Sequence, residues 1–192
     1  MIAYIPFLAA LAASVSAAPA PSIGSRSCAS GFTAGSTSTT ITLAVPMGTI
    51  APVIQSFFNA TWEGITVTST NGTDNKIGST RSFLSGGILP VTEQLLDSTE
   101  DSPYVIERVW TGIGGATRGD TLPITAPSAN FTIDSWTESF TLSPTCSFKA
   151  TEWTWSASYC TNNNTVAHEA YTAAHTGPLD ALAATYGNTT SC

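Results

Sequence analysis

The stretch IGSTRSFLSGGILPVTEQLLD, residues 77–97, predicts two β-strands joined by a glycine turn. Side chains alternate between the two faces of a strand. In the second strand one face is apolar apart from Glu93, and its members are Leu89, Val91, Glu93 and Leu95. In the first strand, Arg81 shares a face with Phe83 and Ile77. A buried charge costs several kcal/mol unless it is paired, so we expect Arg81 and Glu93 to pair on the inner face of the sheet.

Further strands and two helices flank this hairpin. Runs of alternating or β-branched residues predict strands at 38–45, 64–70, 76–84, 88–96, 103–110, 130–142 and 146–160. Apolar residues at helical spacing predict a helix over 48–58, with Thr49 as its N-cap and Pro52 in its first turn. A second helix is predicted over 164–187, interrupted at Gly177-Pro178. The order indicates an α+β protein with helices on one face of an antiparallel sheet.

The charge of the chain is sparse and acidic. There are 13 Asp and Glu residues against 6 Lys and Arg, a net charge of −7. Nucleic-acid binding needs clustered cations, and adhesion to anionic lipid surfaces needs them too. We therefore expect neither partner.

The N-terminus predicts export. Residues 1–17 form a short apolar run ending in Val15-Ser16-Ala17, which fits the small-residue rule for a cleaved signal peptide. Residues 18–37 are rich in Ser, Ala, Pro and Gly and are expected to form an extended lead-in. No later segment is apolar enough to span a bilayer.

Cysteines and glycosylation sequons agree with an exported protein. Four cysteines in such a chain predict two disulfides. Five Asn-x-Ser/Thr sequons are candidate glycosylation sites: Asn59, Asn71, Asn130, Asn163 and Asn188. Together with the Ser- and Thr-rich composition, they favour a eukaryotic, fungal secretory origin.

Three motifs resemble the START-like helix-grip superfamily, which includes Bet v 1-like proteins and polyketide cyclases. They are IGSTRSF (77–83), VTEQLLD (91–97) and GPLDALAATYG (177–187), and the resemblance covers residues 38–187, followed by a tail at 188–192. It implies a curved antiparallel sheet of about seven strands wrapped around a long C-terminal helix, with a short helical segment after the first strand. It also implies an internal cavity for a lipid, sterol or polyketide-like molecule. The turn SGG lacks the proline of the hormone receptors' gate loop, which puts a lid-closing receptor function in doubt.

The resemblance also implies a disulfide pattern. In this fold the first strand lies antiparallel to the last one, and the final helix runs back along that last strand. Cys28 should then lie near Cys160, and Cys146 near Cys192.

The candidate ligand-binding residues follow from strand alternation and from the resemblance. They are Arg81, Phe83, Val91, Glu93, Leu95, Glu107, Val109, Trp136, Trp153 and Trp155. Three interpretations of the charged group remain open: an ion pair that only stabilises the sheet, recognition of a ligand's polar end, or acid–base catalysis of the cyclase or aromatase type. For the protein as a whole, a further alternative is a protein-interaction, effector-like module that uses the fold only as a scaffold.

The aromatic residues of the last two strands form either ordinary core or a pocket wall. They are Trp136, Phe140, Trp153, Trp155 and Tyr159. A glycan on Asn130 would make that residue face outward, and strict alternation would then place Trp136 outside as well unless a bulge intervenes.

Neither a cofactor nor a metal is expected. His168 and His175 are seven positions apart, too far for an ordinary zinc pair, and are predicted to be surface residues. TGIGG, residues 111–115, is not followed by a helix, so it is not a nucleotide loop. The chain has no Gly-x-Ser-x-Gly element and no papain-type cysteine context.

Overall fold

The computed structural model describes residues 27–86, 89–101, 104–113, 124–126, 131–189 and 191–192. The predicted signal peptide, residues 18–26 of the predicted lead-in and Asn130 lie outside these residues. The elements are β1 (Thr33–Leu43), α1 (Met47–Ile50), η1 (Ala51–Val53), η2 (Thr61–Glu63), β2 (Val67–Asn71), β3 (Thr80–Ser85), β4 (Leu89–Asp101), β5 (Val105–Gly112), β6 (Ile124–Ala126), β7 (Phe131–Thr145), β8 (Ala150–Thr161) and α2 (Asn164–Tyr186).

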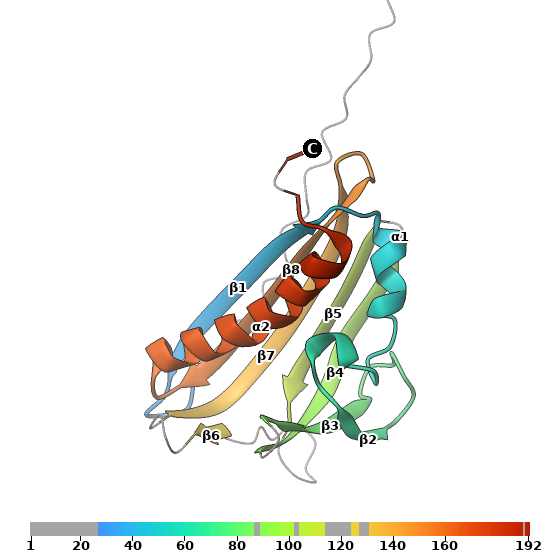
Figure 1. The fold of residues 1–192 in the computed structure, drawn as a ribbon. Coiled ribbons are helices and arrows are strands. Elements are labelled where there is room, and N and C mark those ends of the chain that lie inside the picture. The colour runs from blue at the N-terminus through green and yellow to red at the C-terminus, as the bar shows by residue number, and fades with distance from the viewer. Residues whose placement is uncertain (1–26, 87–88, 102–103, 114–123, 127–130, 190) are drawn as a thin grey trace, which may run out of the picture.

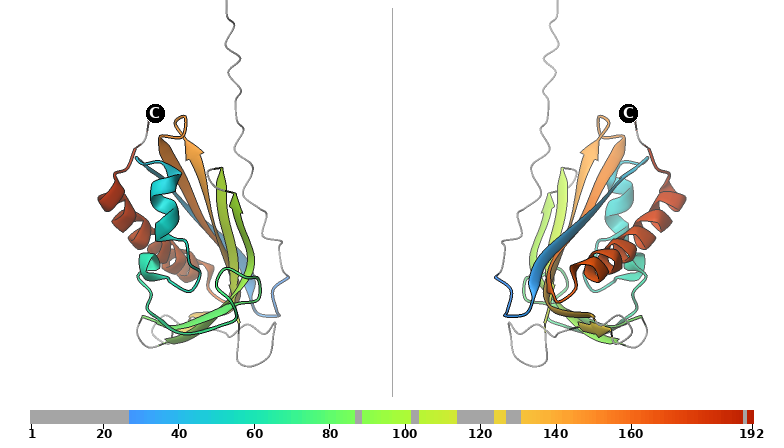
Figure 2. Two further views of the ribbon diagram at one scale, coloured as in Figure 1. Left: turned by 90° about the vertical axis from the view of Figure 1, so that its right-hand side faces the viewer. Right: turned by 90° about the vertical axis from the view of Figure 1, so that its left-hand side faces the viewer.

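The strands form one antiparallel sheet in the order β1-β8-β7-β5-β4-β3-β2, and the short β6 pairs additionally with β7. Figures 1 and 2 show the sheet bent around α2, with α1 on the same face as α2. The fold is therefore the predicted α+β arrangement, a curved antiparallel sheet that holds a long C-terminal helix. No described helix combines the length and the apolar character needed to cross a membrane.

Strand β1 begins earlier than the sequence suggested. It starts at Thr33, within the predicted lead-in, and pairs with β8 from Thr33↔Thr161 to Leu43↔Thr151. On the outer face, hydroxyl groups pair across the two strands, as in Thr40–Thr154 at 3.0 Å. These polar pairs explain why a Ser- and Thr-rich segment forms a strand, since β-branched threonine suits a pleated, half-exposed surface.

Two disulfides fix the ends of the domain. Cys28 is joined to Cys160, and Cys146 is joined to Cys192. This is the pairing expected from the antiparallel arrangement of the first and last strands. Cys146 lies in the turn between β7 and β8, where it and the next two residues have positive φ.

The first helix is shorter than predicted. The expected helix over 48–58 is only α1 followed by one 3₁₀ turn, η1, and its N-cap is Pro46 rather than Thr49. After Ile54 the backbone finds tertiary partners instead of helical ones, because Arg108 donates to its carbonyl oxygen. The apolar residues of this segment are nevertheless buried, as the periodicity indicated; they are Ile50, Ile54 and Phe57.

A bulge in β7 decides which way its aromatic residues face. The register with β8 shifts between Ile133 and Ser135, so that Phe131, Ile133 and then Trp136 all point inward. An extra residue in one strand reverses the alternation beyond it. Trp136 is consequently only 4% exposed.

The interior consists of two hydrophobic clusters. The larger one joins α1, η1 and η2 to the middle of the sheet and to the C-terminal half of α2, and its aromatic members are Phe57, Trp62, Trp110, Phe140, Trp153 and Trp155. The smaller one lies near the other end of the sheet, and its aromatic members are Phe83, Phe131, Trp136, Tyr159 and Tyr171. All five aromatic residues predicted on β7 and β8 therefore face inward.

Helix α2 is continuous. Asn163 caps its first turn by accepting a hydrogen bond from the Val166 amide, and Gly187 follows its last turn. Pro178 lies inside the helix without ending it. The buried face consists of Ala167, Tyr171, His175, Leu179 and Leu182.

Candidate ligand-binding pocket

A pocket of about 850 Å³ lies between the concave face of the sheet and α2. Its wall is mostly apolar, and the residues that supply its aromatic and branched side chains are Ile65, Phe83, Leu89, Val91, Phe131, Ile133, Trp136, Trp155 and Tyr171. Exposed residues of the segment 64–68, of the β3–β4 turn and of α2 form its rim, among them Gly86 and Ala174. The ionisable groups that reach the pocket, besides Tyr171, are Glu63, Glu93, Glu138 and His175.

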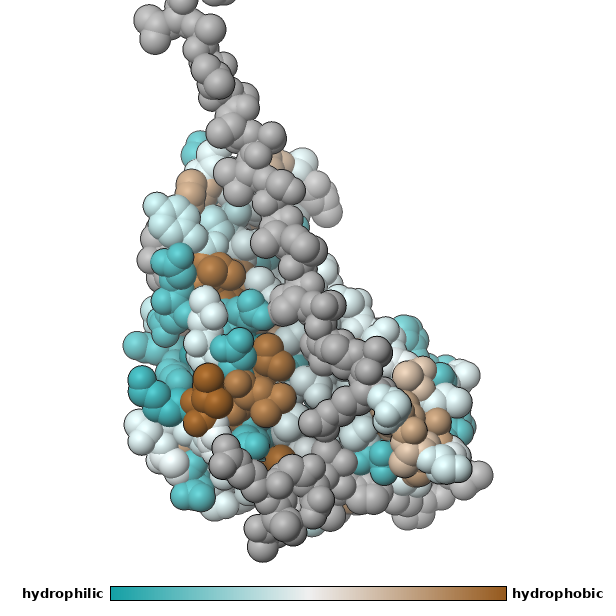
Figure 3. Space-filling view, turned by 180° about the vertical axis from the view of Figure 1, so that it is seen from behind, coloured by the Kyte–Doolittle hydropathy of each residue, from teal (hydrophilic) through white to brown (hydrophobic). Residues whose placement is uncertain are grey.

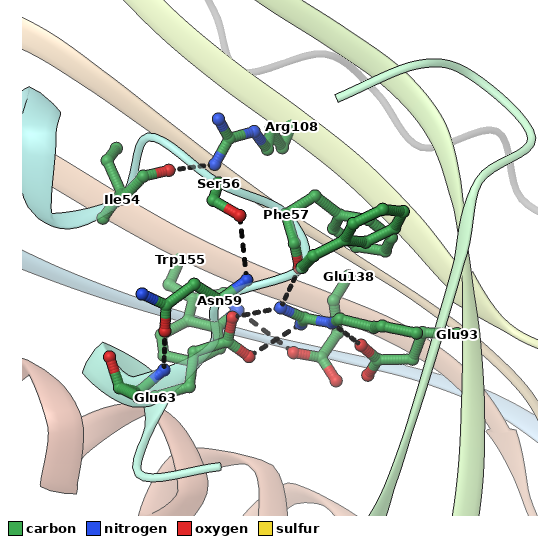
Figure 4. Close-up of polar contacts among 12 residues, drawn as sticks. Ile54, Ser56, Phe57, Asn59, Glu63, Glu93, Arg108, Glu138 and Trp155 are labelled. Atoms are coloured by element: carbon green, nitrogen blue, oxygen red, sulfur yellow. Dashed lines mark hydrogen bonds and ion pairs between the residues drawn. The ribbon is translucent and has the colours of Figure 1, made fainter. Parts of the chain in front are cut away.

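Arg81 organises two of these carboxylates from behind the pocket wall. Its Nε donates to Glu93 at 2.7 Å, and its Nη1 and Nη2 donate to the two oxygens of Glu63 at 2.7 and 2.8 Å (Figure 4). Nη1 also donates to the Phe57 carbonyl oxygen at 3.1 Å. The guanidinium group lies 4.6 Å from the centre of the Phe57 ring. The Arg81 side chain is 2% exposed, so one buried cation serves two buried carboxylates.

Burial and the neighbouring charges shift the pKa values of the group. Burial raises the pKa of Glu93 to about 8, against the opposing attraction of Arg81. Burial raises the pKa of Glu63 as well, and Arg81 again opposes the shift. Burial lowers the pKa of the Arg81 guanidinium, but the two carboxylates outweigh this effect, so its pKa is raised. At neutral pH Glu93 therefore holds a proton.

A second polar group lies beside the first (Figure 4). Glu138 accepts a hydrogen bond from Trp155 Nε1 at 3.0 Å, and the same oxygen lies 3.2 Å from Nε2 of His175. The His175 ring stacks on Trp155, with centroids 4.3 Å apart. The charge of Glu138 contributes to the raised pKa values of Glu63 and Glu93, which places all three carboxylates within one electrostatic field.

We expect Glu93→Gln to flatten the pH dependence of stability. The folded pKa of Glu93, about 8, lies above the usual glutamate value, so the native state holds a proton that the unfolded chain releases. Stability should fall as the pH rises from about 4.5 to 8, by on the order of 1 kcal/mol per pH unit for this group. Glutamine does not titrate and should remove that slope, as measured by urea unfolding between pH 5 and 8. Glu152→Gln, on the outer face of β8, is the control; an unchanged slope in the Glu93 variant would contradict the assignment.

The structure brings together half of the sequence-predicted candidates at the pocket. Phe83, Val91, Glu93, Trp136 and Trp155 line it. Arg81 does not line the pocket but contacts two of its carboxyl groups, the predicted partner Glu93 and also Glu63. Leu95 and Trp153 lie instead in the larger hydrophobic cluster.

Glu107 and Val109 do not join the site. The buried face of β5 is Ile106, Arg108 and Trp110, so the alternation is opposite to the predicted one, and Glu107 lies on the outer face. Figure 3 shows the molecule from behind, where hydrophilic and hydrophobic residues lie side by side. Arg108 can be buried because it donates to the carbonyl oxygens of Ile54 and Gln55. Glu107 and Arg108 are adjacent charged residues, and the sequence pattern did not show which of the two would find hydrogen-bond partners in the interior.

Three residues of the pocket were missed at the sequence level. His175 was expected at the surface but is fully buried, whereas His168 is exposed as predicted. The available signal was the series Ala167, Tyr171, His175, Leu179, spaced by four along α2. Glu138 lies between Trp136 and Phe140 in the alternation of β7 and could have been found there. Glu63 follows no periodic pattern.

The sequons differ in their surroundings. Asn59, Asn71 and Asn188 are exposed. Asn163 is half-buried, and its side-chain oxygen caps α2. Ile77, expected on the inner face beside Arg81, is also exposed, because β3 begins only at Thr80.

Comparison with known proteins defines the class of fold. No protein-family model and no curated protein matches the chain. Among solved structures, a protein from Nitrosospira multiformis is similar with a TM-score of 0.59 at 17% identity, covering 79% of this chain and 96% of its own. An uncharacterized protein from Bacillus thuringiensis has a TM-score of 0.57 at 12% identity, covering 79% of this chain and 98% of its own.

Norcoclaurine synthase from Thalictrum flavum, in complex with dopamine and hydroxybenzaldehyde, is similar with a TM-score of 0.51 at 10% identity, covering 81% of this chain and 90% of its own. Identities this low establish the fold alone. The chain thus has a helix-grip fold of the Bet v 1-like kind.

Proposed function

We propose that the protein is secreted and binds a mainly hydrophobic small molecule between the sheet and α2. The observation that carries this proposal is the pocket of about 850 Å³, which lies within the range of known small-molecule sites. Its mostly apolar wall and its few convergent polar groups are the usual composition of such sites.

The packing of the interior supports this proposal. Protein cores are close-packed, and voids are destabilising. Here the smaller cluster leaves a large space beside Trp136 and Tyr171, and three carboxylates face that space. Selection for stability alone would favour filling it with apolar side chains. The complex of norcoclaurine synthase with two small aromatic compounds adds support, because it has the same fold.

Export is supported by several independent features. The two disulfides are typical of an oxidising compartment. The predicted signal peptide over residues 1–17 and the exposed sequons at Asn59, Asn71 and Asn188 agree with that route.

Replacement of either of two alanine residues on α2 by tryptophan tests the pocket. Ala174 lies at the rim of the pocket, whereas Ala184 is exposed on the same helix and does not line it. We expect Ala174→Trp to weaken binding of the uncharged fluorophore N-phenyl-1-naphthylamine by about tenfold or more, equivalent to about 1.4 kcal/mol, because the indole occupies the space of the guest. Ala184→Trp should leave the affinity unchanged. Equal affinities of both variants and the native protein, or no binding to the native protein, would refute the proposed function.

A further inference from the structure

This inference rests on the proposed function and specifies its ligand. We propose that the pocket selects an organic cation, with the positive group beside Glu63, Glu93 and Glu138 and the apolar part against the aromatic wall. Two observations lead to this conclusion: the sign of the charges that line the pocket and its aromatic surroundings.

The charges that reach the pocket have one sign. Three carboxyl groups line it, of which Glu93 ionises only near its pKa of about 8, and no Lys or Arg is among the described lining residues. Arg81 stands behind the wall with its hydrogen bonds directed to Glu63, Glu93 and the Phe57 carbonyl. A ligand carboxylate or phosphate would meet like charges in a poorly solvated space, which is strongly unfavourable. The field therefore rejects anionic ligands such as fatty acids and favours cations.

The aromatic wall suits a cation as well. Trp136, Trp155 and Tyr171 all line the space next to the carboxylates. Aromatic faces attract cations through the ring quadrupole, and tryptophan does so most strongly. A positively charged group near these rings is stabilised both by the aromatic ring faces and by the carboxylates. An uncharged isostere is stabilised only by the burial of its apolar surface.

Proton exchange at Glu93 couples this binding to pH. A bound cation favours the ionised carboxylate, so below the Glu93 pKa of about 8 binding must expel a proton and becomes weaker. The other groups facing Glu93 are Glu63 from η2, Arg81 from β3, Glu138 from β7, and Tyr171 and His175 from α2, with Arg108 of β5 further away. Burial raises the pKa of Tyr171 well above 10, so Tyr171 stays neutral through this range.

A pair of isosteric probes tests the inference. Benzyltrimethylammonium carries a permanent charge, and neopentylbenzene has the same shape without it, so their difference isolates the charge. We expect calorimetry at pH 8 to show the cation bound at least about tenfold more tightly. Its affinity should fall several-fold from pH 8 to pH 6, while that of the isostere stays constant.

Two variants locate the effect. Glu138→Gln and Glu93→Gln should each reduce the preference for the cation, and Glu152→Gln on the outer face of β8 should not. N-phenyl-1-naphthylamine reports in every sample whether the pocket is intact. If the fluorophore binds at the Ala174 rim and the cation is bound no better than its isostere, the inference is wrong and the proposed function stands. If the fluorophore itself fails to bind to the native protein, both the inference and the proposed function are wrong.

Discussion

Replacement of Arg81 by methionine is expected to lower the free energy of unfolding by about 3–5 kcal/mol. The side chain is 2% exposed and makes three hydrogen bonds to Glu63 and Glu93. Its removal leaves two buried carboxyl groups without the cation that they contact and the Phe57 carbonyl without a donor. Breaking one partner of a buried ion pair is costly because the remaining charge stays desolvated. Urea unfolding with the disulfides intact measures the loss.

The pH dependence of this loss identifies its cause. Without Arg81 the pKa values of Glu63 and Glu93 rise further, so the folded variant must hold both protons. The deficit should be smallest at low pH, where both carboxyl groups are neutral in the native protein and in the variant, and should grow as the pH rises through the folded pKa values of the native protein, which for Glu93 means from about 8 upward. Lys76→Met removes an exposed cation and should change stability by less than about 0.5 kcal/mol.

A triple variant completes the test. Glu63→Gln and Glu93→Gln in the Arg81→Met background remove the two ionisable groups that lack a cation in this variant. Most of the lost free energy of unfolding should then be restored. If Arg81→Met were as stable as Lys76→Met, or if its deficit did not change with pH, the buried cluster would not have the electrostatic role assigned to it.

Gly112→Ala is expected to be the other strongly destabilising change, by about 1–3 kcal/mol through overpacking. Gly112 pairs with Glu93 across the β4–β5 ladder, and the indole ring of Trp136 lies directly over it. A methyl group at this position would overlap three atoms of that ring. Trp136 would have to move into the pocket, so N-phenyl-1-naphthylamine binding should weaken together with stability.

Gly177→Ala is the matched control. Gly177 lies within α2, and apart from its neighbours in the chain a Cβ atom there would meet nothing within 4 Å. Alanine is the better helix former, but a Cβ atom directly before Pro178 is disfavoured in helical backbone, so the two effects oppose and stability should change by less than about 1 kcal/mol. Thermal and urea unfolding should therefore show a clear loss of stability for the Gly112 variant alone. A neutral result at Gly112 would show that the sheet does not depend on that close approach of Trp136.

The hairpin of β3 and β4 shows why part of the site could be predicted. Its turn is short, so the register is local, and alternation alone places Arg81 opposite Glu93, as the ladder confirms. A period-two pattern with a single charge on an apolar face carries enough information for that. The inner face of β4 was found for the same reason.

Other parts depend on contacts that no local pattern contains. In β5 the buried residue is Arg108 rather than Glu107, because carbonyl groups of the segment after η1 accept its hydrogen bonds. Glu63 reaches the pocket only because the 3₁₀ turn η2 brings it to the spare nitrogens of Arg81. His175 belongs to a helix face that is otherwise apolar, and its burial depends on Glu138 of β7. Each of these positions is determined by a partner distant in sequence.

The disulfides have a consequence for the passage of a guest molecule. Cys160 precedes α2 and Cys192 follows it, and each is bonded to a cysteine outside the helix, Cys28 or Cys146. Cys160 belongs to β8, from which α2 continues after two residues, and the Cys146–Cys192 bond fastens the segment after α2 to the turn between β7 and β8. The helix is therefore held close to the strands at both ends while this bond persists. Among the described residues, no disulfide holds the opposite rim around Gly64 and Gly86, so we expect the entrance to widen there.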